Sequence, residues 1–527
     1  MKNRIPALLF LVLIAFPFLP TTLQAQNKEK ESSLLNDQNL SATLQLLASP
    51  EFEGRETGTR GGKLAANYIA SRMMQAGLSP WFKTGKGATQ LSDYFQPFSL
   101  ILYTPAKAAI RISPGKGSKA ALSMTPDGNY IIEDAYQSIN GQYPLIFAGY
   151  GVHAPALGYD SYKGMTVKGK VVMIMEGYPG EGDTLGATWK AFRSHAKEGF
   201  LDFEKRLKVA DSLGAVALII IKNEKPKGEI PGEKKAKKYC GEDLLYQDNE
   251  YLLPGKKPEQ SLPCYYLSSN ASQMICKASG IDNLLKTELS KGGLPQSNQL
   301  AGQTVDIGLK VTADTIIVVN VGGYLRGKDT TRTILVGAHY DHLGKRGTDI
   351  YFGSDDNASG TTGVLTLAGI FGGSGNIPPV NLAFANWTAE EKGLIGSEYF
   401  ASQLASKPGI ELYINMDMIS RSAPDDIAGK IISIGTRPQD ENLKDVAKNN
   451  DLALDESFTL DLWDVTGHTG SDYASFAAKG IPVMTFFSGF HDEYHTPCDT
   501  PDRADLRKMK NILRLVDGCI NSIMQQK

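Results

Sequence analysis

The composition of the 527-residue chain is that of a globular protein with two or three domains, because 42% of its residues are hydrophobic and 21% are charged. A formal net charge of −2 leaves no basic excess of the kind that binds nucleic acid, so we expect no nucleic-acid partner. Five cysteines are too few for a disulfide scaffold in a chain of this length, and the odd count leaves at least one thiol unpaired. The sequence allows a Cys240–Cys264 or a Cys264–Cys276 bridge and does not choose between them.

Residues 1–25 have the pattern of a cleaved secretory signal peptide. Lys2 and Arg4 precede the apolar run ALLFLVLIAFPFL, and the small residue Ala25 follows it. The run is shorter than the ~20 apolar residues that a membrane span needs, which disfavours the alternative of an uncleaved anchor. We therefore expect a periplasmic or secreted protein without a membrane span.

The next part of the chain changes character twice. Within residues 26–104, the segment EFEGRETGTRGGKLAANYIASRMMQ predicts a glycine-rich loop followed by a helix with one apolar face. Residues 105–288 contain short β-rich runs, such as PLIFAGYGV and GKVVMIMEG, and one helical stretch, FEKRLKVADSLGA. This order predicts a mostly β domain that is inserted into a second domain formed by residues 26–104 and 289–527.

Residues 289–527 have the texture of an α/β domain. From about residue 316, apolar runs such as TRTILVGA, NLAFANW and ELYINM alternate with helical segments and lack a polar-apolar alternation within each run. Such runs are typical of strands that helices cover on both faces, so we predict a mixed, largely parallel sheet flanked by helices. Ligands of these sheets bind beyond the carboxyl ends of the strands.

Side chains that can bind metals stand at these strand ends. They follow four of the apolar runs or lie in the turn GSDDNASG: His339, Asp355, Asp356, Glu390, Glu391, Asp417, His491 and His495. One such residue is usually a cap or a surface group, but five strand or turn ends with the same feature indicate a metal site. Histidine and carboxylate ligands suit Zn²⁺, and a second ion would need a bridging carboxylate, for which Asp356 is well placed.

Three neighbouring positions have separate predicted roles. In AHYDH, Asp341 lies two residues after His339 and faces the same side if the strand continues, so it can orient the imidazole, whereas His342 would point away and be structural. Glu390 and Glu391 project in different directions past a strand end. One can therefore bind a metal while the other acts as general base.

The ordered motifs AHYDHLG, GSDDNASG, TAEEKGLIGS, INMDMIS and EYHTPCDT resemble those of co-catalytic zinc aminopeptidases of the bacterial leucyl aminopeptidase and glutamate carboxypeptidase type. EFEGRETGTRGG resembles the N-terminal signature of that family. The middle segment, with FAGYGV and ADSLGAVALII, resembles the protease-associated domain that is often inserted in such enzymes. The resemblance therefore implies a zinc-exopeptidase (phosphorylase/hydrolase-like) fold with an inserted domain.

The same resemblance implies a role for each matched residue. His339 and Asp417 would hold one zinc, Glu391 and His495 the other, and Asp356 would bridge the two. Glu390 would be the general base and would activate a metal-bridged hydroxide. Tyr494 matches a tyrosine that stabilises the oxyanion in some relatives, while Tyr473 stands where relatives frequently have histidine, which concerns the substrate pocket.

We therefore expect a secreted aminopeptidase with two zinc ions per chain, acting on peptides with a free N-terminus. Two alternatives stay open: a glutaminyl cyclase-like acyltransferase with one zinc, and a receptor-like binding protein without metal. The sequence does not specify the preferred N-terminal side chain, the oligomeric state, or whether the enzyme removes one residue, a dipeptide or a C-terminal residue.

Overall fold

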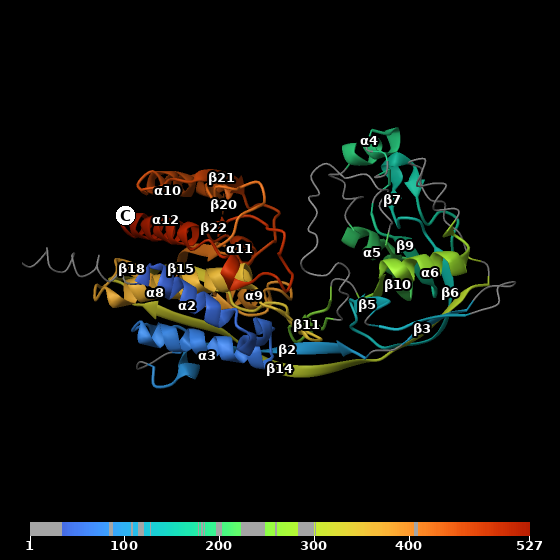
Figure 1. Ribbon diagram of the computed structural model, residues 1–527, viewed down its shortest axis with the longest axis horizontal. Coiled ribbons are helices and arrows are strands. Elements are labelled where there is room, and N and C mark those ends of the chain that lie inside the picture. Colours follow the sequence, from blue (N-terminus) through green and yellow to red (C-terminus); the bar gives the residue numbers. More distant parts are fainter. Residues whose placement is uncertain are drawn as a thin grey trace, which may run out of the picture.

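The computed structural model describes residues 34–526, apart from 84–87, 107–108, 114–120, 127, 178, 181–182, 184, 196–202, 223–247, 259–260, 283–299, 301 and 405–408. Two large sheets organise these residues, and each forms a lobe of its own (Figure 1). The predicted signal peptide, residues 1–25, lies outside the described part. None of the helices within that part has the length and apolar composition needed to cross a membrane.

The first lobe contains a ten-stranded mixed sheet. Its strands, in spatial order, are β11 (Glu250–Leu252), β2 (Phe95–Pro105), β14 (Val311–Leu325), β18 (Val380–Trp387), β15 (Asp329–His339), β19 (Gly409–Met416), β22 (Val483–Phe487), β20 (Ile431–Thr436) and β21 (Thr459–Asp464), with β1 (Ser79–Pro80) beside β14. The mixed α/β fold is thus confirmed. Parallel pairing, however, is limited to the central run β18-β15-β19-β22 and to the outer pair β20-β21, so the sheet is less parallel than predicted.

Antiparallel strands replace the predicted parallel ones because their connections are not helical crossovers. β2 and β14 pair along eleven residues, from Phe95 opposite Val321 to Pro105 opposite Val311, and the whole second lobe connects them. β20 runs antiparallel to β22. Parallel pairing occurs where helices link successive strands, in the central run and in the outer pair β20-β21.

Helices cover both faces of the central strands. One face packs against α2 (Asp37–Leu47), α3 (Arg60–Gln75), α8 (Gly360–Gly373), α10 (Glu441–Asp451) and α12 (Leu506–Met524), and the other against α9 (Ile395–Ser402) and α11 (Tyr473–Ala477). Every residue of β18 is buried, with Leu382 and Phe384 in one core and Ala383 and Trp387 in the other. This two-sided burial explains the absence of alternation in its sequence.

The second lobe is built on an eight-stranded sheet. In spatial order its strands are β4 (Leu122–Met124), β3 (Ile110–Ser113), β13 (Thr304–Leu309), β6 (Ile139–Phe147), β9 (Val171–Met175), β10 (Ala217–Ile221), β12 (Cys264–Leu267) and β5 (Tyr130–Glu133). Helices α4 (Ala187–Ser194) and α6 (Ser269–Ser279) contribute to one core, and α5 (Phe203–Ser212) to another. The second lobe also contains a small hairpin of β7 (His153–Ala154) and β8 (Tyr159–Asp160). A similar hairpin, β16 (Gly344–Arg346) with β17 (Asp349–Tyr351), lies in the first lobe.

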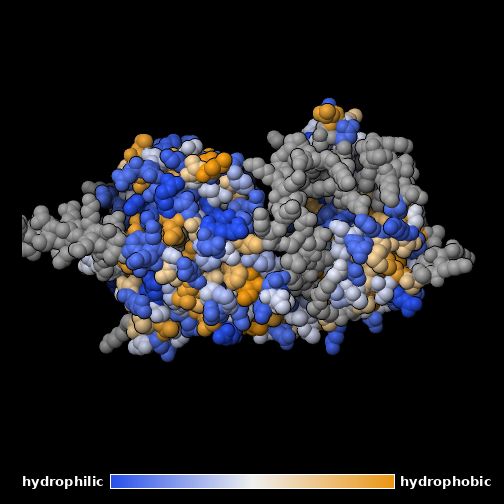
Figure 2. Space-filling view, in the orientation of Figure 1, coloured by the Kyte–Doolittle hydropathy of each residue, from blue (hydrophilic) through white to orange (hydrophobic). Residues whose placement is uncertain are grey.

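The division between the lobes differs in two places from the predicted range 105–288. Strand β13, at 304–309, belongs to the second sheet although it follows residue 288. Strand β11, at 250–252, lies inside the range but pairs with β2 in the first sheet. On the face seen in Figure 2, apolar residues of the first lobe are scattered among hydrophilic ones rather than gathered in one patch.

Both disulfide pairings considered from the sequence are wrong. Cys264 and Cys276 are buried cysteines outside any disulfide, and the Cys264 Sγ lies 3.2 Å from the carbonyl oxygen of Leu262. Cys264 is on strand β12 and Cys276 on helix α6, and each packs into a different core of the second lobe. Cys498, three residues after His495, is the described cysteine that is disulfide-bonded.

Candidate metal centre

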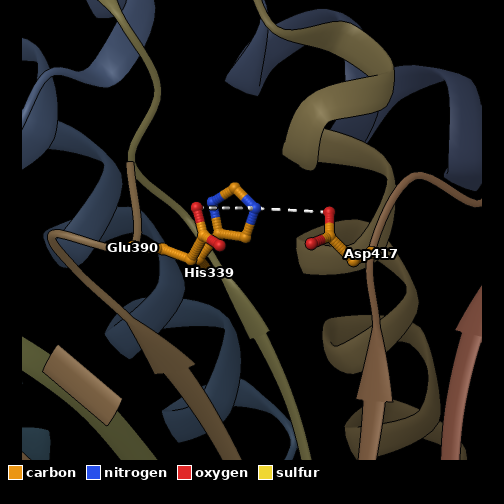
Figure 3. Close-up of side chains that lie close together, drawn as sticks. All are labelled: His339, Glu390 and Asp417. Atoms are coloured by element: carbon orange, nitrogen blue, oxygen red, sulfur yellow. Dashed lines mark hydrogen bonds and ion pairs between the residues drawn. The ribbon is translucent and has the colours of Figure 1, made fainter. Parts of the chain in front are cut away.

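The predicted ligands meet at the carboxyl edge of the central parallel strands. His339 is the last residue of β15, Asp417 directly follows β19, and Glu390 comes three residues after β18. Figure 3 shows the side chains of these three residues converging. The His339 Nε2 atom lies 3.3 Å from Asp417 Oδ1 and 3.8 Å from Glu390 Oε2. Parallel strands that end together therefore bring residues 339, 390 and 417 to one point.

A second group adjoins the first through Asp356. The Asp356 Oδ1 atom lies 3.3 Å from the His339 Nε2, and its Oδ2 atom lies 3.0 Å from the His495 Nε2. The same His495 nitrogen is 3.3 Å from Glu391 Oε2. The two carboxylate oxygens of Asp356 thus face two different histidines, which is the arrangement that a bridging ligand requires.

The donor atoms fit metal ions. His339, Glu390 and Asp417 each present an atom within 4.8 Å of the others, and so do His339, Asp356 and Glu391. Burial raises the pKa of Glu390 well above its usual value, and the neighbouring Asp417 and Glu391 carboxylates add to this effect. So many buried carboxylates repel one another, and divalent cations would offset that repulsion.

Hydrogen bonds from histidine act in the opposite direction on the bridging residue. Burial alone would raise the pKa of Asp356, but contacts from His339 and His495 outweigh it and hold that pKa well below its usual value. Asp356 therefore stays ionised, as a metal ligand must.

Asp341 contacts the site differently from the way the sequence suggested. Its carboxylate is 3.9 Å from the His339 Nδ1, whereas its backbone carbonyl is only 3.2 Å away and takes the place of the predicted acceptor. The reason is that β15 ends at His339, so strand alternation does not continue to residue 341. The carboxylate instead accepts hydrogen bonds from the Thr57 hydroxyl at 3.0 Å and from the Glu390 backbone N–H at 3.2 Å.

His342 does not point away from the site, as the alternation would have required. Its Nδ1 lies 2.6 Å from Glu391 Oε1, and its ring is fully buried. The other oxygen of Glu391 faces His495, so His342 fixes the orientation of that carboxylate from behind. Burial lowers the pKa of His342, which favours the neutral imidazole.

Three of the site's loops carry left-handed backbone at residues other than glycine. Ala389, Met418 and His495 have φ values of 57°, 57° and 55°. Each lies at or next to a predicted ligand or base, and such conformations cost about 1–3 kcal/mol apiece. The Ala389 backbone N–H donates to the Thr57 hydroxyl at 3.0 Å, one of the contacts that hold this turn in place.

Arg55 supports the site through contacts with the backbone, a role that was not predicted from the sequence. Its guanidinium is fully buried and donates to the carbonyl oxygens of Tyr340, Leu47, Phe352 and Gly353 at 2.7–2.9 Å. Burial lowers its pKa to about 10, which still leaves it cationic at neutral pH. A single charge near the buried carboxylates thus holds three chain segments, around residues 47, 340 and 352–353. The only signal in the sequence is its place within the EFEGRETG motif.

A cavity of about 350 Å³ opens beside the ligands. Its wall combines the predicted ligands with apolar, aromatic and other polar residues: His339, Asp356, Glu390, Glu391, Asp417, Met418, Ser433, Asp461, Trp463, His468, Gly470, Ser471, Tyr473, Thr485, Phe487, Phe490, Tyr494 and His495. Tyr494 stacks on the imidazole of His495 with ring centroids 3.8 Å apart. Tyr473, which departs from the expected histidine, lines the cavity and is buried.

One protein-family model covers the part of the chain in which all these ligands lie. Residues 320–519 match peptidase family M28. The resemblance inferred from the sequence motifs is thereby confirmed, because the M28 segment contains every predicted metal ligand between His339 and His495.

Relatives of the chain include, by name, an enzyme that inactivates leupeptin and a probable aminopeptidase. The leupeptin-inactivating enzyme 1 of Streptomyces exfoliatus is 33% identical over 165 residues, which cover 31% of this chain and 34% of that protein. The probable lipoprotein aminopeptidase LpqL of Mycobacterium tuberculosis is 29% identical over 241 residues, covering 39% and 46%. The chain thus spans less than half the length of these relatives.

A solved structure matches the fold over nearly the whole chain. The zinc aminopeptidase BSAP from Bacillus subtilis aligns with a TM-score of 0.57 and 18% identity, over 93% of this chain and 96% of that one. The alignment spans both lobes, so their combined fold recurs in that structure.

Proposed function

We propose that the protein is a zinc-dependent aminopeptidase that holds two zinc ions per chain. The observation that carries the proposal is Asp356, whose two oxygens face His339 at 3.3 Å and His495 at 3.0 Å. His339 and Asp417 would hold one ion, and Glu391 and His495 the other. The bridging geometry supports this assignment over a single-zinc cyclase or a metal-free receptor.

Zinc bound by these residues would polarise the scissile carbonyl and acidify water. The chain's own residues then move the protons. Glu390 accepts a proton from the attacking water and returns it to the departing amine nitrogen, for which its raised pKa is suited. The Glu390 backbone N–H donates a hydrogen bond to the Asp341 carboxylate, which also accepts one from the Thr57 hydroxyl. These two hydrogen bonds hold the backbone of the base in place. Tyr494 lies at the cavity wall and would stabilise the oxyanion.

We also propose that the second lobe is a protease-associated domain, and that residues 1–25 direct secretion. The eight-stranded sheet and its own two cores support the first point. Among the described residues, Asp248 lies 2.7 Å from Lys392, the residue after Glu391, so the lobe adjoins the site through the segment that carries β11. Its influence on the chemistry would therefore be indirect, through the placement of the 390–392 turn.

Two measurements on the same purified protein test the proposal. Elemental analysis after zinc loading should give two ions per chain, and the loaded protein should release leucine from unblocked Leu-p-nitroanilide but not from its N-acetylated form. One zinc per chain with cyclisation of N-terminal glutamine would favour the cyclase, and no zinc with no turnover would favour the receptor. Hydrolysis of N-acetylated peptides from the C-terminus would overturn the aminopeptidase assignment.

A further inference from the structure

The cavity beside the metal ligands has an outer end with a different chemistry from its inner end. Phe487, Ser433 and Asp461 form a row across the adjacent strands β22, β20 and β21, because Ser433 pairs with Phe487 on one side and with Asp461 on the other. All three residues line the cavity. The row leads from the strand beside β19, after which Asp417 lies, to the free edge of the sheet.

Strand alternation directs Asp461 toward this cavity. Asp461 and Trp463 share one face of β21, while the alternate residues Leu460 and Leu462 pack against the main core on the other face. One Asp461 oxygen accepts a hydrogen bond from the Ser433 hydroxyl at 2.6 Å. The Asp461 side chain is exposed, and within the described ranges it forms no ion pair with a lysine or arginine. Its negative charge is therefore held in place by Ser433 and has no described lysine or arginine as an ion-pair partner.

An aromatic wall runs along the same face. The indole of Trp463 lies across Gly435, where an added methyl group would come within 2.6 Å of the ring. Tyr473 and His468 meet the indole edge-on, with ring centroids 5.8 Å and 5.2 Å away. Phe487, the member of the row on β22, also lines the cavity and adds to this wall. The absence of a side chain at Gly435 thus lets a flat apolar surface reach from the ligands toward Asp461.

The spacing of the strands sets the length of side chain that would reach the acid. β21 lies three strand spacings from β19, or about 14 Å at ~4.8 Å each. The ligands and the α-carbon of a bound N-terminal residue occupy the inner part of that span. A branched four-carbon side chain such as leucine would stop at the aromatic wall, whereas the long stems of lysine and arginine carry their charge farther out.

Resting on the proposed aminopeptidase function, we propose that Asp461 selects substrates whose N-terminal residue is lysine or arginine. The Asp461 carboxylate would pair with the side-chain cation, and Trp463 and Phe487 would cover the methylene stem. An exposed ion pair is weak, and a cation over an aromatic face adds a comparable amount, so the expected preference is about three- to tenfold in kcat/KM.

The test compares arginine with citrulline, which has almost the same shape but no charge. The zinc-loaded wild type should hydrolyse Arg-p-nitroanilide about three- to tenfold better than citrulline-p-nitroanilide, and the ratio should shrink in high salt. In Asp461→Asn the ratio should fall to about one, because only the charged substrate loses a partner. Asp464→Asn is the matched control. It removes a charge from the same strand outside the cavity wall, so the ratio and the activity should stay at wild-type values.

Two failures can be told apart. If wild type and Asp461→Asn both hydrolyse Leu-p-nitroanilide and have the same arginine-to-citrulline ratio, only the selection by Asp461 is refuted. The proposed aminopeptidase function then stands, and Asp461 is a charge on an edge strand. A lack of hydrolysis of every amino-acid anilide by the zinc-loaded wild type would refute the proposed function and this inference with it. Product inhibition offers a second readout. Arginine should inhibit the wild type more strongly than citrulline does, whereas the two amino acids should inhibit Asp461→Asn equally.

Discussion

Replacing Arg55 with methionine should destabilise the first lobe by about 3–5 kcal/mol, the usual cost of removing one member of a buried charged network. Methionine is shorter than arginine and lacks the donors for four backbone carbonyls, at Leu47, Tyr340, Phe352 and Gly353. Charge-assisted hydrogen bonds contribute roughly 1.5–3 kcal/mol each, so four of them set an upper limit of about 6–12 kcal/mol. The expected loss of unfolding free energy is smaller than this limit, because the variant also avoids the desolvation cost of the buried guanidinium.

The loss should also weaken metal binding. The carbonyls of Phe352 and Gly353 immediately precede the turn Ser354–Ser359, which carries Asp356. When that turn loosens, the bridging carboxylate is no longer held between the two histidines. We therefore expect less zinc per chain in Arg55→Met under conditions in which wild type is saturated.

Urea unfolding followed by tryptophan fluorescence measures the effect, because Trp81, Trp387 and Trp463 lie in the first lobe. Arg72→Met is the matched control. Its guanidinium is only partly buried and donates to the side chains of Tyr68 and Thr43 rather than to the backbone, so it should cost less than about 1 kcal/mol. An Arg55→Met protein with wild-type zinc content and an unfolding free energy within about 1 kcal/mol of wild type would refute this reasoning.

Three further predictions follow from the site and its supports. Glu390→Gln should retain zinc and lower kcat by about 10²–10⁴-fold, since it removes the proton acceptor; near wild-type turnover in a metal-replete variant would exclude Glu390 as the base. Asp356→Ala should lose zinc from both positions and His495→Ala mainly from one, as measured by elemental analysis, and two retained ions in Asp356→Ala would move the bridge elsewhere. The buried Asp426–Lys508 ion pair, 2.9 Å long, should give acid-dependent stability. Burial would raise the Asp426 pKa, but hydrogen bonds from Lys508 and backbone N–H groups lower it to about 2, so its contribution is complete above pH ~4 and fades between pH 4 and 2. Asp426→Asn should therefore cost about 2–3 kcal/mol at pH 7 and progressively less on acidification, and a pH-independent difference would contradict this assignment.

The sequence by itself indicates which strand ends carry side chains that can bind metal. Apolar runs without alternation indicated strands that helices cover on both faces. When helices connect such strands, the strands run parallel and their carboxyl ends lie at one edge of the sheet. His339, Glu390 and Asp417 could therefore be expected to meet before any contact was known. The predicted second lobe follows from a change of local pattern in the same way. These features depend on short stretches of sequence, where burial and periodicity leave a direct trace.

The directions of the side chains that support the predicted ligands became known only from the three-dimensional structure. Asp341 and His342 contact the site in an unexpected way because β15 ends at His339, and alternation holds only inside a strand. Arg55 reaches Tyr340, 285 residues away, and Ser433 meets Asp461 across two strands at the edge of the sheet. No periodicity records such contacts, because they depend on the relative placement of segments that are distant in the chain. These contacts form only when folding brings the distant segments together at the strand ends.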